Sequence, residues 1–167
     1  MKDHSRAHRY PLYAVLCVLL LATGIATGMA TGTVAQNGVA NPGVLKRMTT
    51  MTTAKTAIDT LANMMAGRFQ FNRSQARAAR RDLISATRSI PSVFRKPHSD
   101  PQSRARTEIW WQWDDFETRA KTAKKAAQAL RVSRLETLRS TLPGLIHACL
   151  DCHRTYRQDK WGSERLR

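Results

Sequence analysis

The sequence is short of cysteine, which restricts the roles open to the cysteines it has. Of its three cysteines, Cys149 and Cys152 share one C-x-x-C motif and Cys17 lies in an apolar run, so no pair remains for a structural disulfide. A redox C-x-x-C usually follows a β-strand, and nothing strand-like precedes this one. A zinc site needs four ligands, and beyond the N-terminal segment only His98 and His147 could complete one, neither in a paired motif. These features disfavour disulfide, thiol-redox and zinc chemistry.

Aromatic residues, valine and isoleucine are also few, and alanine, leucine, arginine and lysine are abundant. This composition favours helices over strands. Acidic residues are scarce too, because 12 of them face 28 basic residues and leave a formal net charge of +16. A charge of this size points to anionic partners, either nucleic acid, a membrane surface or an acidic protein.

The N-terminus resembles an export signal. Basic residues precede an apolar run at 12–22, and small residues then lead to Thr33-Val34-Ala35, which fits a signal-peptidase site. The run is short for a membrane span, but no charged residue occurs from Tyr10 to Leu45, so an uncleaved anchor is the alternative. We predict a signal peptide over 1–35, a single domain over 36–167 and a periplasmic location. Export would separate the protein from nucleic acid, leaving an acidic redox partner or an anionic membrane surface.

The C-x-x-C motif continues into His153, and Cys149-Leu150-Asp151-Cys152-His153 is the attachment signature of a c-type haem. In this motif the two thiols form thioethers with the haem vinyl groups, and the imidazole becomes an axial iron ligand. On a helix, residues at i, i+3 and i+4 share one face, so all three side chains can address one flat ring. We therefore predict one covalent haem c.

Four stretches have apolar residues at steps of three and four, which predicts four amphipathic helices. The first begins at the N-cap Asn41-Pro42 and ends at Gly67, and the second runs from Ser74 to Pro91. The third runs from Thr107-Glu108 to Leu130, and the fourth begins with a capping box, Ser133 to Glu136. The predicted apolar seams are Val44, Met48, Met51, Ile58, Ala62 and Met65; Ala76, Ala79, Leu83, Ala86 and Ile90; Ile109, Trp113, Phe116, Ala120, Ala123, Ala127 and Leu130; and Leu135, Leu138, Leu142, Leu145, Cys149, Cys152 and Tyr156.

Two short connections and one long one, between Pro91 and Thr107, would join these helices into an antiparallel four-helix bundle. We expect Pro143 to kink the fourth helix or delay its start. Because both motif cysteines continue the fourth seam, the haem is expected between helices. Trp110 and Trp111 flank the third seam and are expected either to cover the cofactor or to fill the core.

The order of these features resembles the cytochrome c-prime family, the class II c-type cytochromes. Cys149-x-x-Cys152-His153 near the end of the last helix, followed by Tyr156 and Arg157, is similar to the family's attachment motif. Glu108-Ile109-Trp110 resembles the start of its third helix, and Arg47 followed by Met51 resembles its first helix.

The resemblance implies roles for several residues. Cys149 and Cys152 would form the thioethers, and His153 would be the proximal ligand with Arg157 close to it. Arg47 would approach a haem propionate or the haem edge, and Trp110 would lie near the haem. Met51 would lie on the distal face, with Met48 one turn earlier, either as a sixth ligand or as packing beside an open iron site.

Three functions stay open. The first is an electron-transfer protein, since a single haem without an acid–base pair or nucleophile supplies redox change and no evident substrate chemistry, so we expect no enzyme activity. The second is a five-coordinate haem protein that binds nitric oxide or carbon monoxide. The third is a basic module that docks on a membrane surface or an acidic partner. The resemblance also implies a homodimer through the first two helices, which the arginine-rich second helix opposes.

Overall fold

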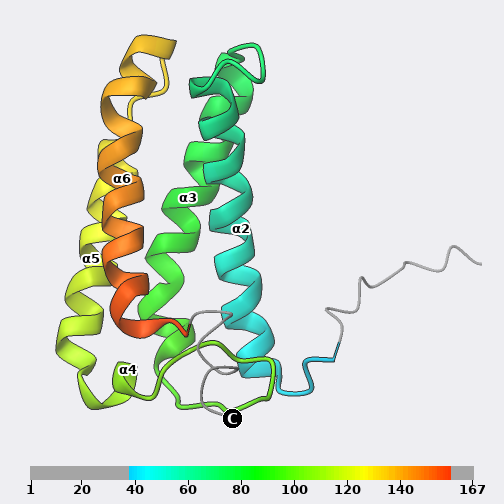
Figure 1. Ribbon diagram of the computed structural model, residues 1–167, viewed down its shortest axis with the longest axis vertical. Coiled ribbons are helices and arrows are strands. Elements are labelled where there is room, and N and C mark those ends of the chain that lie inside the picture. The colour runs from blue at the N-terminus through cyan, green and yellow to red at the C-terminus, as the bar shows by residue number, and fades with distance from the viewer. Residues whose placement is uncertain (1–37, 159–167) are drawn as a thin grey trace, which may run out of the picture. The chain divides into compact units, whose positions relative to one another are not determined.

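The computed structural model describes residues 38–158, and these form an antiparallel four-helix bundle (Figure 1). The helices are α2 (Pro42–Met65), α3 (Arg73–Phe94), the single turn α4 (Glu108–Trp111), α5 (Trp113–Ala129) and α6 (Leu135–Tyr156). Helix α2 packs on α3, α3 on α5, α5 on α6 and α6 on α2, which closes the bundle. The predicted all-α bundle is confirmed. The predicted signal peptide over 1–35 lies outside the described residues, and none of the helices within 38–158 is long and apolar enough to cross a membrane.

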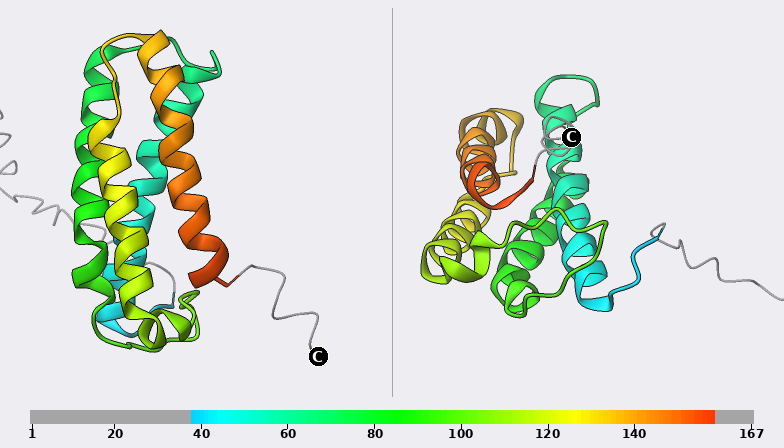
Figure 2. Two further views of the ribbon diagram at one scale, coloured as in Figure 1. Left: turned by 90° about the vertical axis from the view of Figure 1, so that its left-hand side faces the viewer. Right: turned by 60° about the horizontal axis from the view of Figure 1, so that its bottom comes forward.

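The bundle has two poles, and each carries different parts of the chain (Figures 1 and 2). One pole has the short connections α2–α3 and α5–α6. The other has the start of α2, the end of α3, the long 95–107 connection, α4 and the end of α6, which carries the C-x-x-C-H motif. We call the second the motif pole.

The core divides into two clusters. The first is rich in leucine and alanine and is built from Ala57, Leu61, Met64, Ala76, Ala79, Leu83, Ala127, Leu130, Val132, Leu138, Leu142 and Leu145. The second, which we call the aromatic cluster, lies at the motif pole and contains Ile90, Val93, Phe94, Ile109, Phe116, Ala120 and Tyr156. Within it the Phe116 ring lies 5.3 Å from those of Phe94 and Tyr156.

The predicted seams of the second, third and fourth helices are buried or half-buried as expected. The seam of α2 was displaced, because its buried stripe runs through Val44, Arg47, Ala57, Leu61 and Met64. Of the residues predicted there, Met48, Ile58, Ala62 and Met65 lie half-buried beside that stripe. From Arg47 onward, each buried residue lies one position before a residue of the predicted seam, so the stripe is rotated by one residue.

Several helix ends agree with the prediction and others do not. Asn41 caps α2 through Gly43 N at 2.9 Å, and Gly67 follows the helix with a left-handed φ of 72° that favours glycine. The cap of α3 is Asn72, whose Oδ1 accepts from Gln75 N at 3.0 Å, and not Ser74. The predicted end at Pro91 was also wrong, because α3 continues to Phe94.

Helix α3 continues because Val93 and Phe94 are buried in the aromatic cluster. The burial of these side chains offsets the loss of the hydrogen bond that proline cannot donate.

The capping box predicted from Ser133 to Glu136 at the start of α6 is also wrong. There, Arg134 is the N-cap residue, and the Thr137 hydroxyl accepts from its backbone N–H at 3.3 Å. Pro143 does not delay α6, which starts at Leu135 and is continuous through the proline.

The predicted third helix is broken into α4 and α5. Gln112 takes a non-helical conformation with φ −119° and ψ 46°, and α5 restarts at Trp113. The restart places Asp114 and Asp115 in a first helical turn, where the helix dipole favours carboxylates.

Candidate haem-binding site

The C-x-x-C-H motif lies on the last two turns of α6, where the two core clusters meet. The half-buried Cys149 packs against the leucine-rich cluster, and the half-buried Cys152 packs against the aromatic cluster. Both thiols are free. Burial raises the pKa of Cys149, and it raises the pKa of Cys152 to about 11, so both sulfurs stay protonated at neutral pH.

His153 is the third member of the motif and is also half-buried. Burial lowers its pKa, and the positive charge of Arg157 lowers it further. Both effects favour the neutral imidazole, which is the form that binds a metal. Arg157 therefore lies close enough to act on the charge of His153, and its own side chain is exposed beyond the end of α6.

Arg47 is the most unusual residue of the site, because its guanidinium is buried at 3% exposure without a carboxylate partner. Its carbon Cζ lies 5.4 Å from the Phe94 ring centre and 5.3 Å from that of Trp110, and Nη2 donates to the backbone oxygen of His98. The Nε and Nη1 atoms have no hydrogen-bond partner, and burial lowers the pKa of the group.

Leaving a buried charged donor unpaired is costly, and an acceptor carboxylate would remove that cost. A haem propionate is such a carboxylate, and a charge-assisted hydrogen bond to it would use the two free nitrogens of Arg47. The unpaired guanidinium on α2, the paired thiols of α6 and the neutral imidazole of His153 together fit a covalent haem. The assignment of each residue stays a prediction.

The two methionines predicted for the distal side differ in their surroundings. Met51 lies one helical turn after Arg47, is half-buried, and packs against the same aromatic cluster as Cys152. Met48 is half-buried and is not among the described residues that pack on either cluster. The structure therefore brings Met51, and not Met48, next to the cluster that carries the second cysteine.

The two neighbouring tryptophans, Trp110 and Trp111, also differ in their surroundings. The indole Nε1 of Trp110 donates to the backbone oxygen of Phe94 at 2.8 Å, and the ring packs on the aromatic cluster beside Arg47. Trp111 is 79% exposed, so the expectation that it covers the cofactor or fills the core is wrong. The break at Gln112, one residue later, was invisible in the periodic pattern.

An ionic network around Asp151, inside the motif, was missed by the sequence analysis. Arg119 of α5 binds Asp151 at 2.5 Å and Asp115 at 2.7 Å, and Arg154 binds Asp151 at 2.7 Å. The Tyr156 hydroxyl donates to Asp115 at 2.5 Å. Burial and this carboxylate raise the pKa of Tyr156 to about 12. The network joins α5 to the part of α6 that carries the cysteines.

The 95–107 connection closes the site from the motif pole. Asp100 accepts from the backbone N–H groups of Ala40 and Asn41 at 2.9 and 3.0 Å, which ties the connection to the start of α2. Farther along, Ala105 and Arg157 form an antiparallel bridge, and Arg106 N donates to the backbone oxygen of Tyr156 at 3.0 Å. The predicted long loop therefore acts as a crossover that holds both α2 and the end of α6.

The imidazole of His98 packs so closely on Gly43 that a Cβ there would lie 2.1 Å from its Cδ2 atom. A larger residue at position 43 would therefore force the His98 ring to shift. Within the described part of the chain, no three histidine, cysteine, aspartate or glutamate side chains gather as a metal site.

Comparisons with known proteins agree on one family. The family model for cytochrome c' matches residues 43–157. Among solved structures, cytochrome c' from Rhodobacter sphaeroides is 22% identical, with a TM-score of 0.65 over 71% of this chain and 96% of its own. An oxidised cytochrome c556 from Rhodopseudomonas palustris is 18% identical, with a TM-score of 0.65 over 71% and 98% of the two chains. No curated protein sequence matches the chain.

A third solved structure is the nitric oxide complex of an L16I mutant of cytochrome c' from Alcaligenes xylosoxidans. It is 20% identical, with a TM-score of 0.62 over 70% of this chain and 94% of its own. At these identities the solved structures establish the shared fold, and the family model supplies the membership.

Proposed function

Because this chain belongs to the cytochrome c' family, whose members carry a haem c, we propose that it is an exported single-haem electron-transfer protein. When bound, the haem would supply a one-electron change at iron, which no side chain can supply. Cys149 and Cys152 would hold it through thioethers, and His153 would be the proximal ligand. Arg47 would bind a propionate and place positive charge near the iron.

One observation favours electron transfer over gas binding. Met51 packs on the aromatic cluster that Cys152 also contacts, and a thioether is a suitable soft ligand for haem iron. A methionine at the sixth position would leave no open site for a gas. If His153 and Met51 both held the haem, this chain would keep the same two ligands in both oxidation states, as an electron carrier requires.

The second candidate function is the binding of nitric oxide or carbon monoxide at an open sixth position. The nitric oxide complex of the Alcaligenes protein supports it, since that protein shares this fold. In this case Met51 would pack beside the gas without binding the iron. Methionines commonly fill gaps in helical cores in this way.

An optical spectrum of the reduced haem-loaded protein, with and without carbon monoxide, separates the two. Electron transfer with Met51 ligation predicts a low-spin spectrum that carbon monoxide does not change. A high-spin spectrum that shifts on adding the gas would overturn the electron-transfer proposal and support gas binding.

We further propose that an acidic redox partner docks at the motif pole. Lys46, Arg95 and Lys96 are exposed there. Docking steered by these charges should weaken as salt is added. Electron-transfer rates that do not change between 20 and 200 mM salt, a range over which the Debye length falls from ~22 to ~7 Å, would overturn this proposal.

A homodimer through α2 and α3 stays a prediction. A surface hollow runs between these helices and is lined mainly by threonines and alanines, among them Thr49, Thr53, Thr56, Ala78 and Ala79. Small side chains of this kind allow close packing. Exposed arginines at positions 77, 81 and 88 of α3 work against a symmetric contact.

A further inference from the structure

The pole opposite the haem motif is dominated by arginine. The α2–α3 connection, the first turns of α3, the α5–α6 connection and the start of α6 meet there (Figures 1 and 2). We call this the arginine pole, and its members are Arg68, Arg73, Arg77, Arg80, Arg81, Arg131, Arg134 and Arg139. The nearest acidic side chains along the chain are Asp82 and Glu136.

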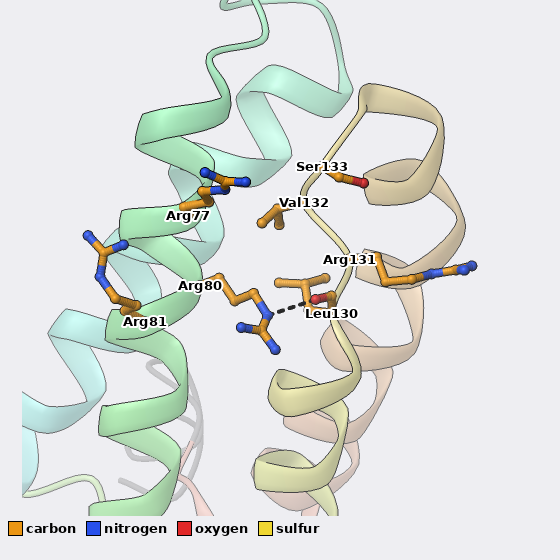
Figure 3. A pocket seen from close by; sticks show the side chains of 7 residues that line it. All are labelled: Arg77, Arg80, Arg81, Leu130, Arg131, Val132 and Ser133. Atoms are coloured by element: carbon orange, nitrogen blue, oxygen red, sulfur yellow. Dashed lines mark hydrogen bonds between the residues drawn. The ribbon is translucent and has the colours of Figure 1, made fainter.

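Some of these arginines support the fold. Arg80 reaches across a hollow to the backbone oxygens of Leu130 and Gln128, at 2.8 and 2.6 Å, and so fastens α3 to the α5–α6 connection (Figure 3). Arg68 donates to Asn63 at 2.6 Å, and Arg139 lies 3.4 Å from the backbone oxygen of Met65. These contacts are all with neutral acceptors, so they leave the positive charge uncompensated.

The remaining members have no carboxylate either. Among the described residues, no ion pair includes Arg73, Arg77, Arg81 or Arg131. The first turn of α3 has no acidic residue, although the helix dipole favours a carboxylate there, and Arg73 occupies the first position. With eight arginines against Asp82 and Glu136, the pole therefore keeps a strong positive potential.

The direction of the side chains indicates the shape of the partner. Arg77, Arg80, Arg81 and Arg131 all line the hollow, but the ends of the Arg81 and Arg131 side chains point away from it on opposite sides (Figure 3). A single small anion requires donors that converge on one point, whereas these arginines come from α3, α6 and both connections at this end of the bundle. Spread charge suits a plane of many anionic groups.

The pole also exposes an aromatic ring. Phe69 is 54% exposed in the α2–α3 connection, directly after Arg68. A phenylalanine among basic residues is the composition of surfaces that lie in the membrane interface, where the ring enters the acyl boundary and the cations meet the headgroups. A water-exposed docking site for an acidic protein would not require this ring.

The arginine pole is too far from the motif for direct electron transfer. His153 lies 18 residues after the first residue of α6, which corresponds to about 27 Å along the helix axis. A redox partner bound at the arginine pole would be separated from the haem by most of the bundle. Electron exchange with a partner therefore does not account for this surface.

We propose that the arginine pole binds the anionic headgroups of a membrane surface, with Phe69 at the interface, and holds the motif pole toward the aqueous phase. This inference does not rest on the proposed electron transfer, because lipid binding is measured without any redox reaction.

The test is co-sedimentation of the haem-loaded full chain with vesicles of phosphatidylcholine alone or with one third phosphatidylglycerol. We expect binding that requires phosphatidylglycerol and weakens between 50 and 300 mM salt. The variant Arg73→Gln/Arg77→Gln/Arg81→Gln should bind on the order of a hundredfold more weakly. The control Lys46→Gln/Arg95→Gln/Lys96→Gln removes the same charge from the motif pole and should bind nearly as well as the native protein.

A second variant separates lipid from acidic protein. Phe69→Ser should weaken vesicle binding and leave binding to soluble polyglutamate unchanged. Three outcomes would overturn the proposal: equal binding to both vesicle types, equal losses in the two triple variants, or polyglutamate binding with no vesicle binding. None of them bears on the spectrum that tests electron transfer.

Discussion

The Nη1 atom of Arg119 lies 2.5 Å from the carboxylate of Asp151, the residue that directly precedes the second cysteine of the haem motif. Arg119 also binds Asp115 at 2.7 Å, so one side chain of α5 holds both its own helix and the motif of α6. Its side chain is 28% exposed, and those of its partners are 40% and 48% exposed. Water therefore partly screens both ion pairs of Arg119.

Replacing Arg119 by glutamine should lower the free energy of unfolding by about 1 kcal/mol, because two ion pairs are lost together. For a bundle of this size we expect Tm to fall by about 4 °C in thermal unfolding followed by circular dichroism. Lys121→Gln is the matched control, since it breaks the exposed i,i+4 pair with Glu117 and should change Tm little. Equal shifts in both variants would show that Arg119 has no special role in holding α6.

Replacing Met51 by leucine should convert a low-spin haem spectrum into one that responds to carbon monoxide. Leucine has a similar volume but no sulfur, so packing against the aromatic cluster is retained and the proposed ligand is lost. Met48→Leu should leave the spectrum unchanged. If the Met51 variant kept the native spectrum, Met51 would not be the ligand.

Replacing Arg47 by methionine should lower the reduction potential by tens of millivolts, measured by spectroelectrochemistry. The guanidinium supplies a buried positive charge, and two charges about 10 Å apart interact by about 1–2 kcal/mol at an effective dielectric constant of 20. Lys46→Met removes a charge from the exposed neighbouring position and should have a much smaller effect. A potential unchanged in the Arg47 variant would place its guanidinium away from the haem.

Acid should destabilise the bundle. Hydrogen bonds from the backbone N–H groups of Gln102, Asn41 and Ala40 lower the pKa of Asp100. The pKa values of Asp115 and Asp151 are lowered chiefly by hydrogen bonds from Tyr156 and Arg154 respectively, and by Arg119. When the folded pKa lies below the ordinary value, the folded state binds fewer protons, so its stabilising effect is present at neutral pH and is lost below about pH 4.

Urea unfolding midpoints at pH 7, 4 and 3 test this prediction, and they should fall at the acidic end. Asp100→Asn should flatten that dependence, because one of the titrating groups is removed while an acceptor oxygen remains. A variant with the same pH profile as the native protein would mean that Asp100 does not contribute to it.

The periodic pattern predicted the four helices and the inward position of the motif, because core burial imposes spacings of three and four. The α3, α5 and α6 seams agree with the structure for that reason. The buried stripe of α2 lies one residue earlier than predicted, because neighbouring apolar residues fit either register and the buried Arg47 gives no apolar signal. Its burial depends on Phe94 and Trp110, which come from distant parts of the chain.

The other differences between the predictions and the structure also arise from contacts between residues far apart in the chain. Pro91 was expected to end a helix, and the burial of Phe94 in a cluster built by other elements extends it. The contacts of Asp100 with the start of α2, and of Asp151 with α5, join residues that no local pattern relates. Asp151, next to Cys152, was visible in the sequence, but its partner could be found only from the packing of α5 on α6.

The crossover between α3 and α4 also has a consequence for the order of folding. Arg47 and Cys149 are separated by about a hundred residues, and the 95–107 connection is fastened both to the start of α2 and to Arg157 beyond α6. Contacts at such separations require large loops to close, which slows their formation relative to local helix contacts. We therefore expect the helices, and the contacts between helices adjacent in sequence, to form first. The contacts of the 95–107 connection around the haem motif should form in the last step of refolding.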